Sequence, residues 1–65
     1  MASASGLTAT LANATTYIIT NEKGETVGQC TSDKYGMWNL NVPGVVCDTD
    51  CFRHDLFERH DIEVA

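Results

Sequence analysis

The chain has 65 residues, of which 43% are apolar and 20% charged, and a formal net charge of −5. This length predicts one small domain, 1–65, and the composition predicts a folded chain rather than a disordered one. Only four residues are basic, which disfavours nucleic acid and anionic membrane surfaces as partners because both require clustered cations. No apolar run approaches the roughly 20 residues that span a bilayer.

The first part of the chain predicts a flexible start followed by a strand. Residues 1–6 are mostly small and are expected to be flexible. Leu7, Ala9 and Leu11 then alternate with threonines, which is the period of a half-buried strand. We therefore expect the ordered fold to begin near Leu7.

The next segment predicts a β-hairpin. Residues 16–20 are β-branched and aromatic, which favours a strand. Asn21 and Gly24 follow in the positions that a tight turn requires, since glycine accepts a positive φ at little cost. The chain is then expected to return as a strand over 25–30.

The clearest alternation in the chain lies in residues 37–42. Trp38, Leu40 and Val42 share one face, and a methionine and two asparagines occupy the other. Pro43-Gly44 comes next, the pair typical of the centre of a type II turn. We expect a hairpin there, with a loop somewhat longer than two residues.

The C-terminal part changes character. A helix is expected from near Asp50 to near Arg59, with its cap supplied by an acid or threonine within 48–50. Phe52 and Leu56 are four residues apart and predict an apolar stripe that lies on the sheet. The expected fold is therefore a small β-rich α+β domain. It consists of an antiparallel meander of four to five short strands, with one short C-terminal helix packed on it and a last short edge strand over 62–64.

Three cysteines allow one disulfide and one remaining thiol. The candidate pairs are Cys30–Cys47, Cys30–Cys51 and Cys47–Cys51. Closing the loop from Cys30 to Cys47 would stabilise a small domain by roughly 3 kcal/mol in the chain-entropy model, whereas the loop from Cys47 to Cys51 restrains little. The odd cysteine suits a linked homodimer, and the alternative is that all three are reduced.

The same cysteines suggest a zinc site as an alternative. Zinc takes four tetrahedral ligands from cysteine and histidine. Cys30, Cys47, Cys51 and His54 form the more plausible set, because His60 lies about 240° round a helix from His54. No other cofactor is expected.

Catalysis is not expected. Cys51 and His54 share a helical face in this interpretation, but a domain of this size has little room for a substrate pocket. The chain has neither a glycine-rich phosphate loop nor a nucleophile elbow. We assign no catalytic residue and predict a protein that is not an enzyme.

The acidic tail is the predicted contact surface. Its residues are Asp55, Phe57, Glu58 and Asp61. Phe57 adjoins Leu56 and points about 100° away from it on a helix, so it is either partly exposed beside the acids or part of the core. An exposed Phe57 would suit a protein contact.

These observations predict a small acidic protein–protein interaction module. The expected form is a secreted effector, toxin or inhibitor, stabilised by a disulfide and acting on another protein. A partner with a basic surface would suit the acidic chain. Secretion is favoured by the Ala-, Ser- and Thr-rich residues 1–20 and by Asn13-Ala14-Thr15, a formal N-glycosylation acceptor. The first six residues lack the features of a signal peptide, so secretion implies a mature form with an added Met1. The alternative is a cytosolic or virus-encoded acidic inhibitor with reduced thiols.

Overall fold

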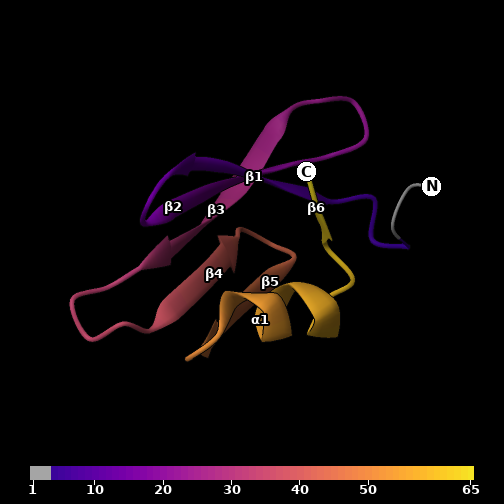
Figure 1. Ribbon diagram of the computed structural model, residues 1–65. Coiled ribbons are helices and arrows are strands. Elements are labelled where there is room, and N and C mark those ends of the chain that lie inside the picture. The colour runs from indigo at the N-terminus through magenta and orange to yellow at the C-terminus, as the bar shows by residue number, and fades with distance from the viewer. Residues whose placement is uncertain (1–3) are drawn as a thin grey trace.

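The computed structural model describes residues 4–65, which form a curled six-stranded sheet and one short helix (Figure 1). The elements are, in chain order, β1 (Thr8–Asn13), β2 (Thr16–Thr20), β3 (Thr26–Ser32), β4 (Trp38–Val42), β5 (Val46–Asp50), α1 (Arg53–Arg59) and β6 (Glu63–Val64). The strands lie in the order β5-β4-β3-β2-β1-β6, antiparallel except for the pair β1 and β6. The predicted α+β meander, its C-terminal helix and its last short edge strand are therefore confirmed.

Two of the hairpin turns have the same construction. The side chain of Asn21 accepts hydrogen bonds from two backbone N–H groups of its turn, at 2.9 and 3.0 Å, and Gly24 has a φ of 81°. Asp33 and Gly36 repeat this arrangement, with bonds of 2.9 and 3.0 Å and a φ of 79°. An Asn or Asp side chain holds each turn from within, as such residues do elsewhere. The predicted turn at Asn21 is confirmed.

The turn between β4 and β5 also follows the prediction. The N–H of Val45 donates to the carbonyl of Val42 at 2.9 Å, and Gly44 has a φ of 77°. These are the features of a type II turn with proline at its second position. Val42 pairs with Val46, so three residues separate the strands, which is the longer loop expected.

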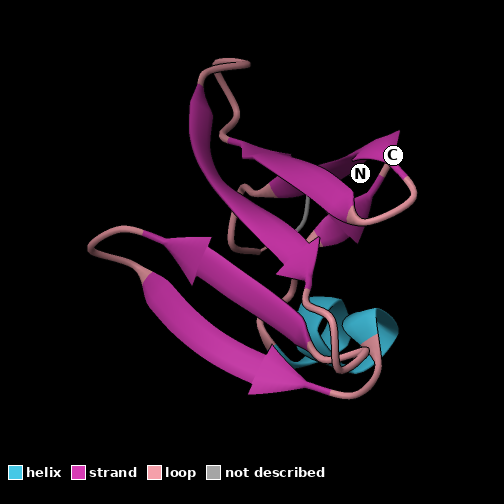
Figure 2. Cartoon of the chain, turned by 90° about the vertical axis from the view of Figure 1, so that its left-hand side faces the viewer, coloured by secondary structure: helices cyan, strands magenta, loops and turns pink. Residues whose placement is uncertain are grey.

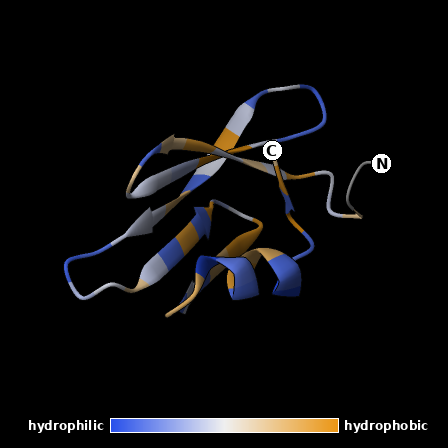
Figure 3. Cartoon of the chain, in the orientation of Figure 1, coloured by the Kyte–Doolittle hydropathy of each residue, from blue (hydrophilic) through white to orange (hydrophobic). Residues whose placement is uncertain are grey.

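One side of the sheet forms the core. Trp38, Leu40 and Val42 are all buried, as their alternation predicted, and Figure 3 shows that alternation as bands of different hydropathy along β4. Leu11 departs from the pattern and is 57% exposed, because β6 pairs with β1 only at its first two residues and a bulge follows Leu11. The buried core residues are Leu7, Ala9, Tyr17, Ile19, Cys30, Trp38, Leu40, Val42, Leu56, Phe57 and Ile62.

The helix closes the core. It joins β5 at one edge of the sheet to β6 at the other (Figure 2). Leu56 and Phe57 are 0% and 3% exposed, and the ring of Phe57 lies edge-on to Tyr17, with 5.2 Å between the ring centroids. Phe52 is 59% exposed, so the predicted stripe of Phe52 and Leu56 is wrong. In residues 4–65, no helix has the length and apolar character to cross a membrane.

The helix begins at Arg53, later than the start near Asp50 that the acidic residues 48 and 50 predicted. Residues 48–50 belong to β5, where Asp50 pairs with Trp38 across the β4–β5 ladder. Phe52 occupies the N-cap position and makes no side-chain cap bond, while the Asp50 carboxylate accepts a bond from the Phe52 N–H at 3.1 Å. The predicted cap was wrong because strand pairing uses these residues first. The predicted end at Arg59 is confirmed.

The helix ends in a Schellman motif. The N–H of Ile62 donates to the carbonyl of Phe57 at 2.7 Å, and the N–H of Asp61 donates to that of Glu58 at 3.2 Å. Asp61 takes the left-handed conformation that glycine usually fills, with a φ of 53°. Its carboxylate accepts a hydrogen bond from the N–H of Ala4 at 2.6 Å. Ala4 and Ser5 thus contact the tail through Asp61. The predicted flexibility of residues 1–6 stays a prediction, and residues 1–3 lie outside the described residues.

This conformation makes a prediction for Asp61. Asp61→Gly and Asp61→Ala both remove the bond to Ala4, but only glycine accepts the left-handed conformation without steric cost. We expect the alanine variant to be less stable than the glycine variant by about 1 kcal/mol. Urea denaturation of the two variants measures the difference, and equal midpoints would show that the left-handed conformation costs nothing here.

Candidate functional site

Across β1 to β5, two rows of uncharged side chains lie on the outward side of the sheet. Successive residues of a strand point to opposite faces of the sheet. The residues next to the buried ones along each strand therefore point outward. Strand register aligns them in two rows across the sheet. We call these nine side chains the neutral face: Thr10, Ile18, Gln29, Asn41 and Cys47 in one row, and Thr16, Thr31, Asn39 and Thr49 in the other.

The neutral face is accessible and rich in hydrogen-bonding groups. All nine of its side chains are exposed or half-buried. The Thr49 hydroxyl donates to the Asn39 amide oxygen at 3.0 Å, which links β5 to β4 on this surface. Hydroxyls and amides dominate, and each of these groups can both donate and accept hydrogen bonds. The face therefore offers hydrogen bonds without the desolvation cost of a charge.

The charged residues of β5 lie on the opposite side, under the helix. Asp48 forms an ion pair with Arg59 at 3.0 Å and a hydrogen bond with His60 at 2.8 Å, and Asp50 pairs with Arg59 at 3.2 Å. The His60 hydrogen bond, supported by the Thr49 N–H and by Arg59, lowers the pKa of Asp48 to about 2. These contacts tie the end of α1 to the β5 edge. Inward-pointing charges also protect that edge from pairing with other strands.

The lowered pKa of Asp48 predicts acid sensitivity. An acid whose pKa is depressed in the folded state stabilises the fold above its unfolded pKa, near 3.9, and that stabilisation is lost as the pH falls. We expect the urea midpoint, followed by Trp38 fluorescence, to fall between about pH 4 and pH 2. Asp48→Asn should make this fall shallower. If it leaves the acid dependence unchanged, the His60–Asp48 contact does not stabilise the fold.

Exposed apolar side chains also occur at the end of the sheet where β4 begins and β5 ends. Tyr35 in the β3–β4 turn is 78% exposed, and Phe52 follows β5. Met37 and Cys51 lie between these two segments, with their sulfur atoms 3.5 Å apart. The Phe52 ring also lies beside the His54 imidazole, 5.6 Å between centroids. Exposed aromatic residues beside an uncharged surface are typical anchors of protein contacts.

Arg53 links the first turn of α1 to the sheet. Its Nε donates to the Tyr17 hydroxyl at 3.0 Å. Its guanidinium also lies over the rings of Tyr17 and Trp38, at 5.6 and 5.4 Å. These contacts fix the first turn of α1 to the sheet through cation–π attraction and a hydrogen bond.

The predicted tail surface does not form as a unit. Phe57 is buried in the core, so its predicted place on a contact surface is wrong. Asp61 holds the N-terminal segment through Ala4. Asp55 and Glu58 remain on the helix surface and, together with a neighbouring arginine, line an open depression of about 290 Å³.

The three cysteines are free thiols in this fold. Cys30 points into the core, and burial raises its pKa to about 11. Cys47 and Cys51 point outward, on the other side of the sheet. Cys47 lies within the extended strand β5 and Cys51 follows the end of that strand, and the two thiols are not bonded to each other. No predicted intrachain pair is therefore brought together.

The predicted zinc ligands are also separated. Cys30 lies on the inner side of the sheet, Cys47 and Cys51 on the outer side, and His54 pairs with Asp55 on the helix at 3.2 Å. Over the described range 4–65, no three His, Cys, Asp or Glu residues are grouped to hold a metal ion. The structure therefore does not bring the four predicted zinc ligands together, because strand alternation divides them between two faces.

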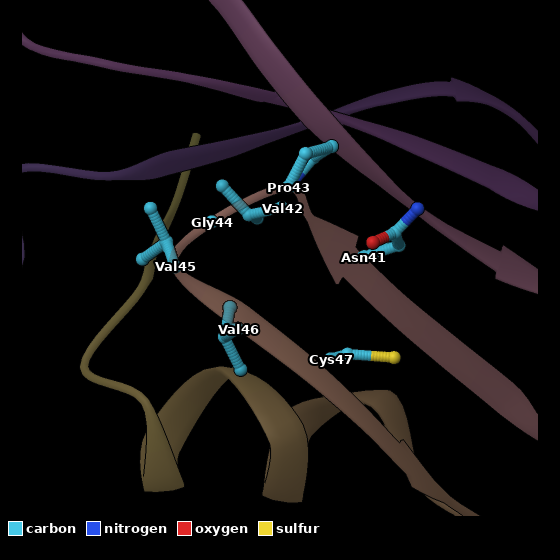
Figure 4. A pocket seen from close by; sticks show the side chains of 7 residues that line it. All are labelled: Asn41, Val42, Pro43, Gly44, Val45, Val46 and Cys47. Carbon is cyan, nitrogen blue, oxygen red and sulfur yellow. The ribbon is translucent and has the colours of Figure 1, made fainter.

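The β4–β5 turn carries a shallow depression of about 250 Å³. Figure 4 shows Val46 directed toward α1 while Cys47 and Asn41 point away from it, on the neutral face. The lining residues are Asn41, Val42, Pro43, Gly44, Val45, Val46 and Cys47. An open, mainly apolar hollow of this kind does not enclose a substrate.

Comparison with protein-family models, with curated proteins and with solved structures gave no match. The neutral face is therefore identified only from strand register and side-chain alternation. Sequence reasoning missed it because its residues come from five strands and become neighbours only through register. The available signal was the outward row of 37–42, which already lacked charge.

Proposed function

We propose that this protein is a small non-enzymatic interaction module that contacts a protein partner through the neutral face. The observation that carries the proposal is the separation of charge. A fifth of the residues are charged, yet the nine side chains that form the two outward rows across β1 to β5 are all neutral. Depletion of charged residues at the centre is the compositional mark of protein interfaces.

The ends of the neutral face supply the rest of an interface. Tyr35, which is 78% exposed, offers an aromatic anchor at the end where β4 begins. Asp33 and Lys34 lie in the same turn as Tyr35, and the Asp33 carboxylate accepts a hydrogen bond from Asn39 at 3.3 Å. This arrangement matches a neutral centre with a charged rim.

The shape and charge of the protein define the partner. The neutral face is the outer, convex side of a curled sheet (Figure 2), so a concave or flexible partner surface fits it best. That surface should present hydroxyl, amide and apolar groups at its centre. The net charge of −5 favours basic residues around it, because complementary charge speeds association.

We also propose that the protein acts with reduced thiols. The support is the placement of Cys30 inside the core and of Cys47 and Cys51 outside it. Intact mass before and after reduction should be the same, and a gain of two hydrogens on reduction would contradict this. Secretion stays a prediction from composition, and a signal peptide in the full reading frame would support it.

Partner capture tests the proposed surface. Immobilised wild-type protein is compared with Asn41→Lys, which places a charge at the centre of the neutral face. Val45→Lys is the matched control, since it adds the same charge to an exposed position of the same hairpin. We expect Asn41→Lys to lose partners that wild type and Val45→Lys retain. Equal capture by both variants would contradict the proposal.

A further inference from the structure

Two sulfur atoms meet at the end of the β4–β5 ladder. Trp38 pairs with Asp50, and one position further along, Met37 lies opposite Cys51. Their sulfur atoms are 3.5 Å apart. Cys51 is exposed and Met37 half-buried, so an ion from solvent can reach both. The contact joins residues 14 positions apart in the chain.

We propose that Cys51 and Met37 bind one soft monovalent metal ion, Cu(I) or Ag(I). Thiolate and thioether sulfurs are the protein ligands that select Cu(I). Monovalent d¹⁰ ions accept two sulfur ligands, whereas zinc requires four ligands. On binding, the Cys51 thiol releases its proton to solvent and the thiolate takes its place on the metal. The positive ion and the thiolate leave the site neutral.

The position of the two sulfurs favours this chemistry. Each belongs to a residue next to a strand end, and the ladder between the strands sets their separation. The unbranched Met37 side chain can adjust its sulfur to the ion. Cys47 is also an exposed thiol on the outer face, but its cross-strand neighbour is Asn41, which offers no sulfur. Cys47, which lies within β5, is therefore a matched control for Cys51 just beyond the end of that strand.

The methionine methyl groups report binding directly. The chain has two methionines, Met37 and Met1, so protein labelled with ¹³C at the methionine methyl gives two assignable signals. We expect addition of one equivalent of Ag(I) to shift the Met37 signal and to leave that of Met1 in place. No shift at Met37, or equal shifts at both methionines, would overturn the proposal.

Three variants test the ligand set. Cys51→Ser should abolish the Met37 shift, and Cys47→Ser should preserve it. Met37→Leu conserves volume and should weaken Ag(I) binding at Cys51 by at least about tenfold, the lower end of the loss seen when outer partners of metal ligands are removed. Unchanged affinity in Met37→Leu would show that the thioether is not a ligand. Because the probe is the metal alone, this result is independent of partner capture.

Discussion

Replacing Leu56 with alanine is expected to lower the free energy of unfolding by about 2–5 kcal/mol, the range for truncating a large core side chain. Leu56 is fully buried between α1 and the sheet. The helix has only seven residues, too few for stability without packing. A small domain has about 5 kcal/mol in total, so Leu56→Ala should leave much of the chain unfolded. Urea denaturation followed by Trp38 fluorescence measures the loss.

Phe52→Ala is the control for this prediction. Phe52 is a large apolar residue like Leu56, but its side chain lies outside the core. Truncating it should therefore change the free energy of unfolding by no more than about 0.5 kcal/mol. Together the two variants separate the observed docking from the predicted stripe of Phe52 and Leu56. A stable Leu56→Ala protein with a destabilised Phe52→Ala protein would contradict the observed packing.

Gly28→Ala is expected to cost about 3 kcal/mol, the upper end for overpacking a filled space. A Cβ at position 28 would collide with the carbonyl oxygen of Asn41 and would lie 2.8 Å from the Cα of Val42. Both obstacles are backbone atoms of β4, which cannot move without disturbing the ladder. Glycine at this point of β3 allows β4 to approach closely.

Gln29→Ala provides the comparison for Gly28. Gln29 is the next residue of β3 and points outward on the neutral face, so its truncation should change stability by about 0.5 kcal/mol at most. Thermal unfolding of both variants by circular dichroism gives the two values. If Gly28→Ala is as stable as Gln29→Ala, the close approach of β3 and β4 is not a constraint on this fold.

The local parts of the fold were predictable because local chemistry determines them. Alternation of Trp38, Leu40 and Val42 identified a strand and its buried face. Asn21 and Gly24 identified a turn, since both residues stabilise turn conformations within a few positions. These features depend on neighbouring residues only.

The parts that failed depend on contacts between distant segments. Asp48 and Asp50 resemble helix caps in isolation, but pairing with β4 makes them strand residues. Phe52 was expected on the buried stripe of the helix but precedes the helix, which starts at Arg53, and is exposed. Phe57 was expected on the contact surface but is buried. The cysteines were judged by loop length, whereas strand alternation places Cys30 on the opposite side of the sheet from the other two. The neutral face could not be assembled until the register of five strands was known.

Site-specific photo-crosslinking tests the proposed contact surface most directly. A photoreactive amino acid is placed at Gln29 or Asn41 on the neutral face, or at Glu58 on the helix, and the protein is irradiated in the cells that produce it. We predict crosslinks to a partner protein from Gln29 and Asn41, and none from Glu58. Crosslinks from Glu58, with none from the two neutral-face positions, would contradict the account and would place the contact surface on the acidic tail.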